Sequence, residues 1–205
     1  RMSAWVITGI FLVLYFGVSV WLLRGKIRLG ARELCVCGVM IAMTLILEMI
    51  RIPIPTGATI PLASPVPLLL LAVLWDYRLA ILSGWVCGIA GIFVVPAWQP
   101  VHPAQILIEH MVCFSCLGYA GVFGTDRRWK VLCGIVLASV LKLCGHLLSG
   151  VLFFSQNAWE GWGAWGYSMG YNISQNIPLC VIAGIIVMAL PLKALGRVVR
   201  KEPVI

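Results

Sequence analysis

Long runs of apolar residues, separated by short polar stretches, form the dominant pattern along the chain. A membrane-spanning helix needs about 20 mainly apolar residues. Seven runs approach this length: Ser3–Leu23, Ala31–Ile50, Ile60–Trp75, Leu79–Val95, Pro103–Phe123, Trp129–Phe154 and Asn172–Leu195. The third run is short and interrupted by proline, and the seventh contains Pro178. The pattern predicts an all-α protein, a polytopic transmembrane helical bundle.

Composition supports this fold class. Of the 205 residues, 61% are hydrophobic and only 11% are charged, and the mean hydropathy is +1.02. This number of charges is too small to cover the surface of a soluble domain of this length. We therefore expect the lipid bilayer to surround the chain. The sequence also lacks the G-x-x-x-x-G-K-[ST] loop that a P-loop ATPase needs.

The basic residues behind the formal net charge of +8 lie mostly in loops on one side of the predicted bundle. Cytoplasmic loops of membrane proteins are enriched in Lys and Arg. The loops that fall on one side of a seven-span bundle hold Arg24, Lys26, Arg28, Arg32, Arg78, Arg127, Arg128, Lys130, Lys193, Arg197, Arg200 and Lys201, whereas the other side holds Arg1 and Arg51. We therefore expect the N-terminus outside and the C-terminus in the cytoplasm. No basic stripe suits a nucleic acid partner.

Charged and polar residues within the apolar runs are candidates for function, because a charge in the membrane is costly. Glu109 lies in the fifth run, and Lys142 and His146 lie one turn apart on the sixth. Glu48, near the outer end of the second run, carries less weight. Two structural alternatives stay open: Glu109 and Lys142 could form a buried ion pair that fixes helix packing, and His146 could be a core histidine.

Aromatic and amide side chains gather in the predicted outer loop Ser155–Tyr171, just before Asn172. Trp98, Trp159 and Trp162 alone would be explained by an aromatic belt at the membrane interface. A belt does not require Gln156, Asn157, Tyr167 and Asn172 beside them. Together with a carboxylate and a histidine beneath, these residues predict a pocket for a flat, cationic molecule that forms hydrogen bonds.

The eight cysteines all lie in apolar runs. Cys113 and Cys116 have C-x-x-C spacing, but no second pair of ligands accompanies them. We interpret the cysteines as packing residues, and we expect neither a metal nor a cofactor.

Two segments resemble a known family. Residues 146–172 read HLLSGVLFFSQNAWEGWGAWGYSMGYN, and residues 101–110 read VHPAQILIEH. Together with Lys142, they resemble the thiamine-specific substrate-binding subunit (S component) of energy-coupling factor (ECF) vitamin transporters. The resemblance covers about Ala31–Leu195. It implies a six-helix fold that binds thiamine near the outer face, and it implies a transmembrane coupling subunit and two cytoplasmic ATPase subunits as partners.

The resemblance also implies roles for individual residues. Glu109 would face the cationic thiazolium or form a hydrogen bond with the ligand. His146 and Tyr167 would contact the ligand, and Asn172 would form a hydrogen bond with the aminopyrimidine. The expected substrate-binding set is completed by Trp98, Gln99, His110, Phe154 and Trp159. The chain departs from the family pattern at Phe154, where the family often has Trp, and at His110, which replaces a Tyr. Gln99, with Trp98 beside it, occupies a place where a Tyr can occur.

The first run has no counterpart in the six-helix pattern. We therefore expect residues 1–28 to form an added N-terminal membrane anchor with a basic loop, and residues 29–205 to form the substrate-binding domain. On the second run, Cys35 and Val39, or Gly38 and Ala42, have the spacing that permits close helix approach, so they are candidates for contact with the coupling subunit. Packing within the chain is an equal alternative.

Three other functions stay open at this stage. The ligand could be a thiamine precursor or another flat vitamin-like base. The chain could be a membrane enzyme that uses Glu109 and His146 as acid and base, although no nucleophile accompanies them and the resemblance implies no enzyme. It could also be an assembly or sensor protein that binds no small molecule.

Overall fold

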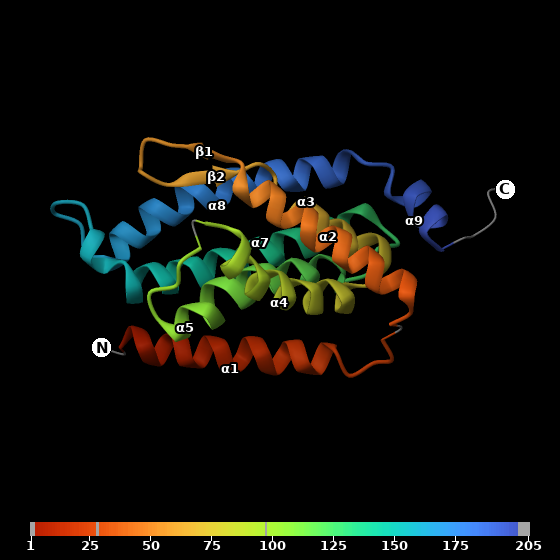
Figure 1. The fold of residues 1–205 in the computed structure, drawn as a ribbon, viewed down its shortest axis with the longest axis horizontal. Coiled ribbons are helices and arrows are strands. Elements are labelled where there is room, and N and C mark those ends of the chain that lie inside the picture. Colours follow the sequence, from red (N-terminus) through yellow and green to blue (C-terminus); the bar gives the residue numbers. More distant parts are fainter. Residues whose placement is uncertain (1–2, 28, 97, 201–205) are drawn as a thin grey trace.

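The computed structural model describes residues 3–27, 29–96 and 98–200. Its long helices are α1 (Ala4–Leu22), α2 (Ala31–Met49), α4 (Tyr77–Val94), α7 (Arg128–Phe153) and α8 (Ala164–Ala189), which run along one bundle (Figure 1). Among the described residues, α1, α4, α7 and α8 are long and apolar enough to cross a membrane. A helix of 19 residues such as α1 is about 28 Å long, close to the thickness of the hydrocarbon core.

Two further helical segments are composites. The first joins α3 (Val66–Leu70) to the π-helical turn η1 (Leu71–Trp75). The second joins α5 (Pro103–Gln105), the π-helical η2 (Ile106–Val112), α6 (Cys113–Ser115) and the 3₁₀ helix η3 (Cys116–Gly121). π-helical turns are rare and occur frequently at functional sites, and η2 carries Glu109.

A short hairpin follows α2 where the sequence predicts a loop over Ile52–Thr59. Strands β1 (Arg51–Pro53) and β2 (Thr59–Pro61) pair antiparallel, with Ile52 opposite Ile60. Gly57 in the turn has a φ of 84°, which glycine adopts without strain. The third span therefore begins at Val66 rather than Ile60, because Ile60 belongs to β2. The hydroxyl groups of Thr56 and Ser174 lie 3.0 Å apart and tie the hairpin to α8.

The last part of the chain also differs from the prediction. α8 begins at Ala164 rather than Asn172, so Tyr167 and Tyr171 lie on a helix and not in a loop. α8 ends at Ala189, before Pro191, and α9 (Leu192–Arg200) is a separate helix rather than its continuation to Leu195. Proline lacks the N–H that a continuing helix needs, so Pro191 stops α8. A 3₁₀ turn, η4 (Ser155–Asn157), follows α7.

The largest apolar core lies between α2, η1, α4, η3, α7, α8 and α9, and includes Leu71, Leu117, Val131, Val187 and Leu192. The composite segment 103–121 runs against α4 and α7. Its approach is close: a Cβ on Gly84 would meet the backbone of Ser115, and a Cβ on Gly134 would meet the carbonyl of Ala120. These glycines thus set the distance between the helices that hold Glu109 in place.

Helix α1 lies on the opposite side of the bundle from α2 (Figure 1). It packs against α7, and Phe16 contacts Trp85 of α4 with 6.1 Å between ring centroids. The three residues of α1 that are buried, Thr8, Tyr15 and Ser19, are all polar. Its apolar side chains, among them Val13 and Leu14, are largely exposed, as expected of a helix that faces lipid.

Candidate ligand-binding site

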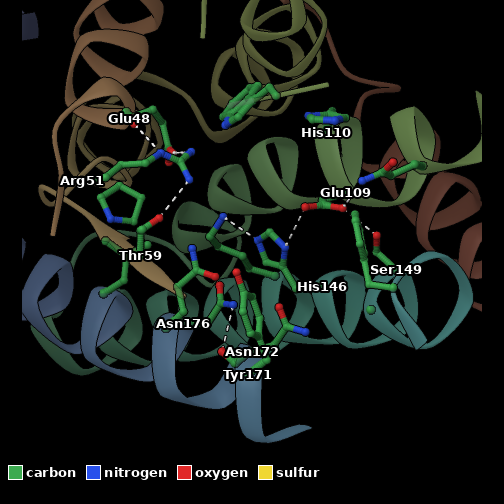
Figure 2. Close-up of a pocket in the computed structure, with 18 of the residues that line it drawn as sticks. Glu48, Arg51, Thr59, Glu109, His110, His146, Ser149, Tyr171, Asn172 and Asn176 are labelled. Atoms are coloured by element: carbon green, nitrogen blue, oxygen red, sulfur yellow. Dashed lines mark hydrogen bonds and ion pairs between the residues drawn. The ribbon is translucent and has the colours of Figure 1, made fainter. Parts of the chain in front are cut away.

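A polar hollow of about 360 Å³ opens between α2, the hairpin, η2, α7 and α8. Its size suits a small organic ligand. Figure 2 shows that charged, amide and hydroxyl side chains from these elements point into it. The lining residues are Glu48, Arg51, Thr59, Pro61, Trp98, Gln99, Gln105, Glu109, His110, Phe114, Lys142, His146, Ser149, Gly150, Phe154, Asn157, Tyr167, Tyr171, Asn172, Gln175, Asn176 and Leu179.

Glu109 occupies the wall formed by η2. Its Oε2 accepts hydrogen bonds from Gln105 Nε2 at 2.8 Å and from Ser149 Oγ at 2.6 Å, and its Oε1 lies 3.8 Å from His146 Nδ1 (Figure 2). About a quarter of the side chain (26%) remains exposed in the hollow. Neutral donors orient this carboxylate, and its other oxygen remains available to a cationic ligand.

Lys142 is buried one helical turn below His146. Its Nζ lies 3.3 Å from His146 Nε2 and 4.8 Å from the centroid of the Phe114 ring. Such a position over an aromatic face partly compensates for lost hydration. In the part of the chain that the structure describes, Lys142 forms no ion pair within 4.0 Å of Glu109. The alternative of a structural Glu109–Lys142 pair therefore does not hold in this structure.

A second carboxylate at the other side of the hollow is neutralised within the chain. Glu48, which is 3% exposed, accepts hydrogen bonds from Arg51 Nη2 at 3.0 Å and from Ser64 Oγ at 2.5 Å. Arg51 also contacts Thr59 of β2 at 3.3 Å. Arg51 thus joins the end of α2 to the hairpin.

The wall formed by α8 carries amides at helical spacing. Asn172 Nδ2 donates to the carbonyl of Ser168 at 2.9 Å, and Asn176 Nδ2 donates to the carbonyl of Asn172 at 3.1 Å. The donors of both amides are therefore partly occupied within α8. Their carbonyl oxygens have no partner among the described residues and can accept a hydrogen bond from a ligand. Tyr167 and Tyr171 pack together on the same helix, with 5.8 Å between ring centroids.

The hollow brings together most of the residues expected to bind substrate: Trp98, Gln99, Glu109, His110, His146, Phe154, Tyr167 and Asn172. Trp159 is not among the lining residues. Its ring packs edge-on against Tyr167, with 5.2 Å between centroids, so it supports a lining residue from behind. His110 packs against Trp98 with 5.2 Å between centroids. Its Nε2 is buried and has no hydrogen-bond partner among the described residues.

Sequence reasoning missed several polar lining residues. Helical spacing could have identified some of them, because Gln105 precedes Glu109 by one turn, Ser149 follows His146 by one turn, and Asn176 follows Asn172 by one turn. Arg51 appeared to be a loop charge. Its contribution depends on the hairpin, which turns the chain back toward the end of α2.

Helices long enough to cross a membrane, together with a polar internal hollow, define a multi-pass membrane protein with a site for a small molecule. The chain belongs to a particular family of this class: residues 34–198 match the family described as thiamine transporter protein (Thia_YuaJ). The chain is therefore a thiamine-binding component of a membrane transporter and not an enzyme, which removes the alternative of Glu109 and His146 as acid and base.

Two proteins of known name are similar to this chain. The thiamine transporter ThiT of Bacillus subtilis (strain 168) is 25% identical over 167 residues, covering 74% of this chain and 86% of that protein. A structure of ThiT from Listeria monocytogenes, obtained by native-SAD phasing, superposes with a TM-score of 0.70 at 24% identity and covers 80% of this chain and 96% of that one. The latter match shows that the two chains share a fold.

Proposed function

We propose that this protein is the substrate-binding subunit of an ECF-type transporter. It captures thiamine in the hollow at the outer face of the cell membrane, and a transmembrane coupling subunit with two cytoplasmic ATPases drives uptake. One observation carries the proposal: in a member of a thiamine transporter family, Glu109 presents a carboxylate to a polar hollow that has aromatic walls.

Glu109 is the charged group of the hollow that is best placed to meet a positively charged ligand, because the cation Lys142 lies beside His146 and over Phe114. Arg51 neutralises Glu48 at 3.0 Å. Glu109 has no Lys or Arg within 4.0 Å among the described residues. The thiazolium ring of thiamine would place a positive charge beside Glu109, and cations bind favourably beside both a carboxylate and aromatic faces.

Thiamine also carries an aminopyrimidine ring, whose amino group donates hydrogen bonds and whose ring nitrogens accept them. Asn172 on α8 offers a carbonyl oxygen to the amino group, and Tyr167 provides an aromatic surface beside it. His146, on the opposite wall, faces the space between Glu109 and Asn172 (Figure 2). We assign Glu109 to the thiazolium half, Asn172 to the pyrimidine half, and His146 and Tyr167 to contacts between them.

The distribution of cations supports an outward-facing hollow. We call the end of the bundle away from the hairpin the cationic end. Its described lysines and arginines are Arg24, Lys26, Arg32, Arg78, Arg127, Arg128, Lys130, Lys193 and Arg197. We call the hairpin end the pocket end. Among the described residues, the basic side chain at this end is that of Arg51. Under the positive-inside rule, the cationic end and the C-terminus face the cytoplasm, and the pocket and the start of α1 face outside. Arg1, Arg28 and Lys201 lie outside the described residues.

The proposed partners supply the energy and the movement. The 205 residues contain no P-loop, so ATP hydrolysis through such a loop requires another subunit. Cys35, Gly38, Val39 and Ala42 are all exposed on α2. Outside the adjoining turns of its own helix, no atom of the described residues lies within 4 Å of the position a Gly38 Cβ would take. This face is open to close approach by a second helix, which supports contact with the coupling subunit rather than packing within the chain.

The division of the chain follows the same proposal. The match to the family begins at residue 34 and leaves α1 outside it. We propose that residues 29–205 form the six-helix substrate-binding domain, and that residues 1–28 are an addition to it.

A ligand titration tests the proposed function. Thiamine added to the purified protein should quench tryptophan fluorescence and saturate in the micromolar range, because Trp98 lines the hollow. Recovery of unchanged thiamine would show binding without chemistry. Absence of saturation would refute thiamine as the ligand. Tighter binding of the isolated pyrimidine alcohol than of thiamine would instead favour a precursor.

Reconstitution tests the need for partners. In lipid vesicles, the subunit alone should bind thiamine without accumulating it, and accumulation should require the coupling subunit, both ATPases and ATP. Uptake by the subunit alone would contradict the ECF proposal while leaving thiamine binding intact.

A further inference from the structure

Helix α1 contacts the segment that carries Glu109 at both ends and in the middle. At the pocket end, the Trp5 ring lies edge-on to His102, with 5.9 Å between centroids. His102 caps α5 by accepting a hydrogen bond from the backbone N–H of Ala104 at 3.1 Å. In the middle, Ile7 and Phe11 pack in the cluster around Ile108, which is fully buried and precedes Glu109.

The third contact is a pair of buried hydrogen bonds. Tyr15 and Ser115 join their hydroxyl groups at 2.6 Å, and Ser19 joins Tyr119 at 2.8 Å. The Ser115 hydroxyl also donates to the carbonyl of Met111, within η2, at 2.6 Å. Because a serine hydroxyl has a single hydrogen, Tyr15 must be the donor to Ser115. A directed chain therefore runs from α1 through Ser115 to the π-helical turn that holds Glu109.

This arrangement differs from that of a simple membrane anchor. An anchor needs only an apolar surface, yet the three residues of α1 that are buried against the bundle are all polar. Without α1, the Tyr119 hydroxyl would lose its partner Ser19 and face hydrocarbon, where an unpaired polar group is costly, and Ser115 would keep only its bond to Met111. The segment 103–121 thus depends on α1 along the side opposite the hollow, and its own π-helical turn leaves its geometry open to adjustment.

We infer that α1 is a positioning element of the binding site: the hydrogen bond from Tyr15 to Ser115 fixes η2 so that Glu109 meets the positive charge of the ligand. This inference rests on the proposed function, because it requires thiamine in the hollow. Tyr15 acts through Ser115 and Met111 and does not touch the ligand. Its loss should therefore weaken the contact made by Glu109 and spare the contacts made by α8.

The test compares Tyr15→Phe with Thr8→Val in purified full-length protein. Thr8 is a matched control because it is buried on α1 but bonds only to the carbonyl of Ala4 in its own helix. Tyr15→Phe should weaken thiamine binding roughly three- to tenfold, the range that an interhelical hydrogen bond in a membrane supplies. Thr8→Val should leave it unchanged. Ser19→Ala, which removes the pair with Tyr119, should act in the same direction but less strongly.

Two readouts separate positioning from general loosening. Binding of the isolated pyrimidine alcohol should be unchanged in Tyr15→Phe, because that fragment lacks the thiazolium. In the Glu109→Gln background, Tyr15→Phe should add nothing, because the two residues act through one contact. Equal losses for thiamine and the pyrimidine alcohol, additive effects with Glu109→Gln, or an equal effect of Thr8→Val would each overturn the inference.

Wild-type protein that fails to bind thiamine would refute the proposed function itself, whereas normal thiamine binding by both wild type and Tyr15→Phe would refute only the role of α1.

Discussion

The pocket end and the cationic end of the bundle carry their charges in opposite ways. At the pocket end, Glu48 and Arg51 pair at 3.0 Å with side chains that are 4% and 24% exposed. At the cationic end, Asp126 and Lys130 pair at 2.9 Å with side chains that are 57% and 29% exposed. Beneath the first pair lies a polar hollow, and beneath the second lies the apolar core. Two ion pairs of nearly equal length thus lie in different settings, one beside the candidate binding site and one on the exposed surface.

The difference indicates where loss of one charged side chain should lower the stability of the protein most. A buried carboxylate that loses its partner retains the cost of dehydration, whereas an exposed one regains water. The pocket end should therefore be sensitive to single polar substitutions, and the cationic end to changes in packing. The following substitutions test this contrast, beginning with the largest expected effect.

Arg51→Met should have the largest effect on stability. It leaves Glu48 buried without its cation, which should lower the free energy of unfolding by about 3 kcal/mol. Thermal and denaturant unfolding in detergent would measure the loss. Lys130→Met, at the exposed pair, should cause no measurable change. Adding Glu48→Gln to Arg51→Met should restore part of the stability, and equal effects of the two single substitutions would remove the contrast between the ends.

Glu109→Gln should have the largest effect on binding. It keeps the size of the side chain but removes the charge that we assign to the thiazolium, so the affinity for thiamine should fall about tenfold or more. Lys142→Met should weaken binding much less, since Lys142 lies beside His146 and over Phe114. Fluorescence or calorimetric titration of both variants measures the two losses, and equal losses would contradict the assignment of Glu109 to the positive charge of the ligand.

Gly134→Ala should probe the packing of the cationic end. The added Cβ would collide with the carbonyl of Ala120, and overpacking of this kind typically costs about 1–3 kcal/mol. Unfolding should therefore begin at a lower temperature, while thiamine affinity changes little. A stable Gly134→Ala variant with weakened binding would show that the two ends are less independent than their charges suggest.

Gly38→Ala should have the smallest effect on the isolated subunit. Its Cβ meets open space, and replacing glycine by alanine within a helix typically adds about 0.5–1 kcal/mol of stability. Thiamine affinity should not change, but copurification with the coupling subunit should decrease if α2 forms that contact. Unchanged assembly would exclude close approach at Gly38.

Much of the fold could be predicted from the sequence because membrane thickness sets the length of an apolar run. Each of the seven predicted spans contains a helical segment in the structure. The hairpin could not be predicted in this way, since its strands have three residues each and contain Pro53 and Pro61. The start of α8 was hidden because Trp165, Gly166 and Tyr167 resemble a loop in composition. It is helical because aromatic rings from the preceding turn pack on it, with Trp159 against Tyr167.

The candidate site divides in a similar way. Glu109 and His146 could be predicted because ionisable residues in apolar runs are rare enough to indicate a site. Arg51 and Thr59 could not, because their positions beside Glu48 depend on the hairpin, which turns the chain back toward the end of α2. The part played by α1 was also missed, since its overall apolarity concealed the polar face formed by Thr8, Tyr15 and Ser19.

The π-helical turn η2 also makes the chain sensitive to length. Each residue of an α-helix turns the part that follows by about 100°, and each residue of a wider π-helical turn by somewhat less. Deleting one residue between Ile106 and Val112 would therefore turn Glu109 away from the hollow, or turn Ser115 away from Tyr15, because both sets of contacts depend on the same rotation. This segment can accept changes of side chain far more readily than changes in residue number, so its spacing is as much a part of the binding site as its carboxylate.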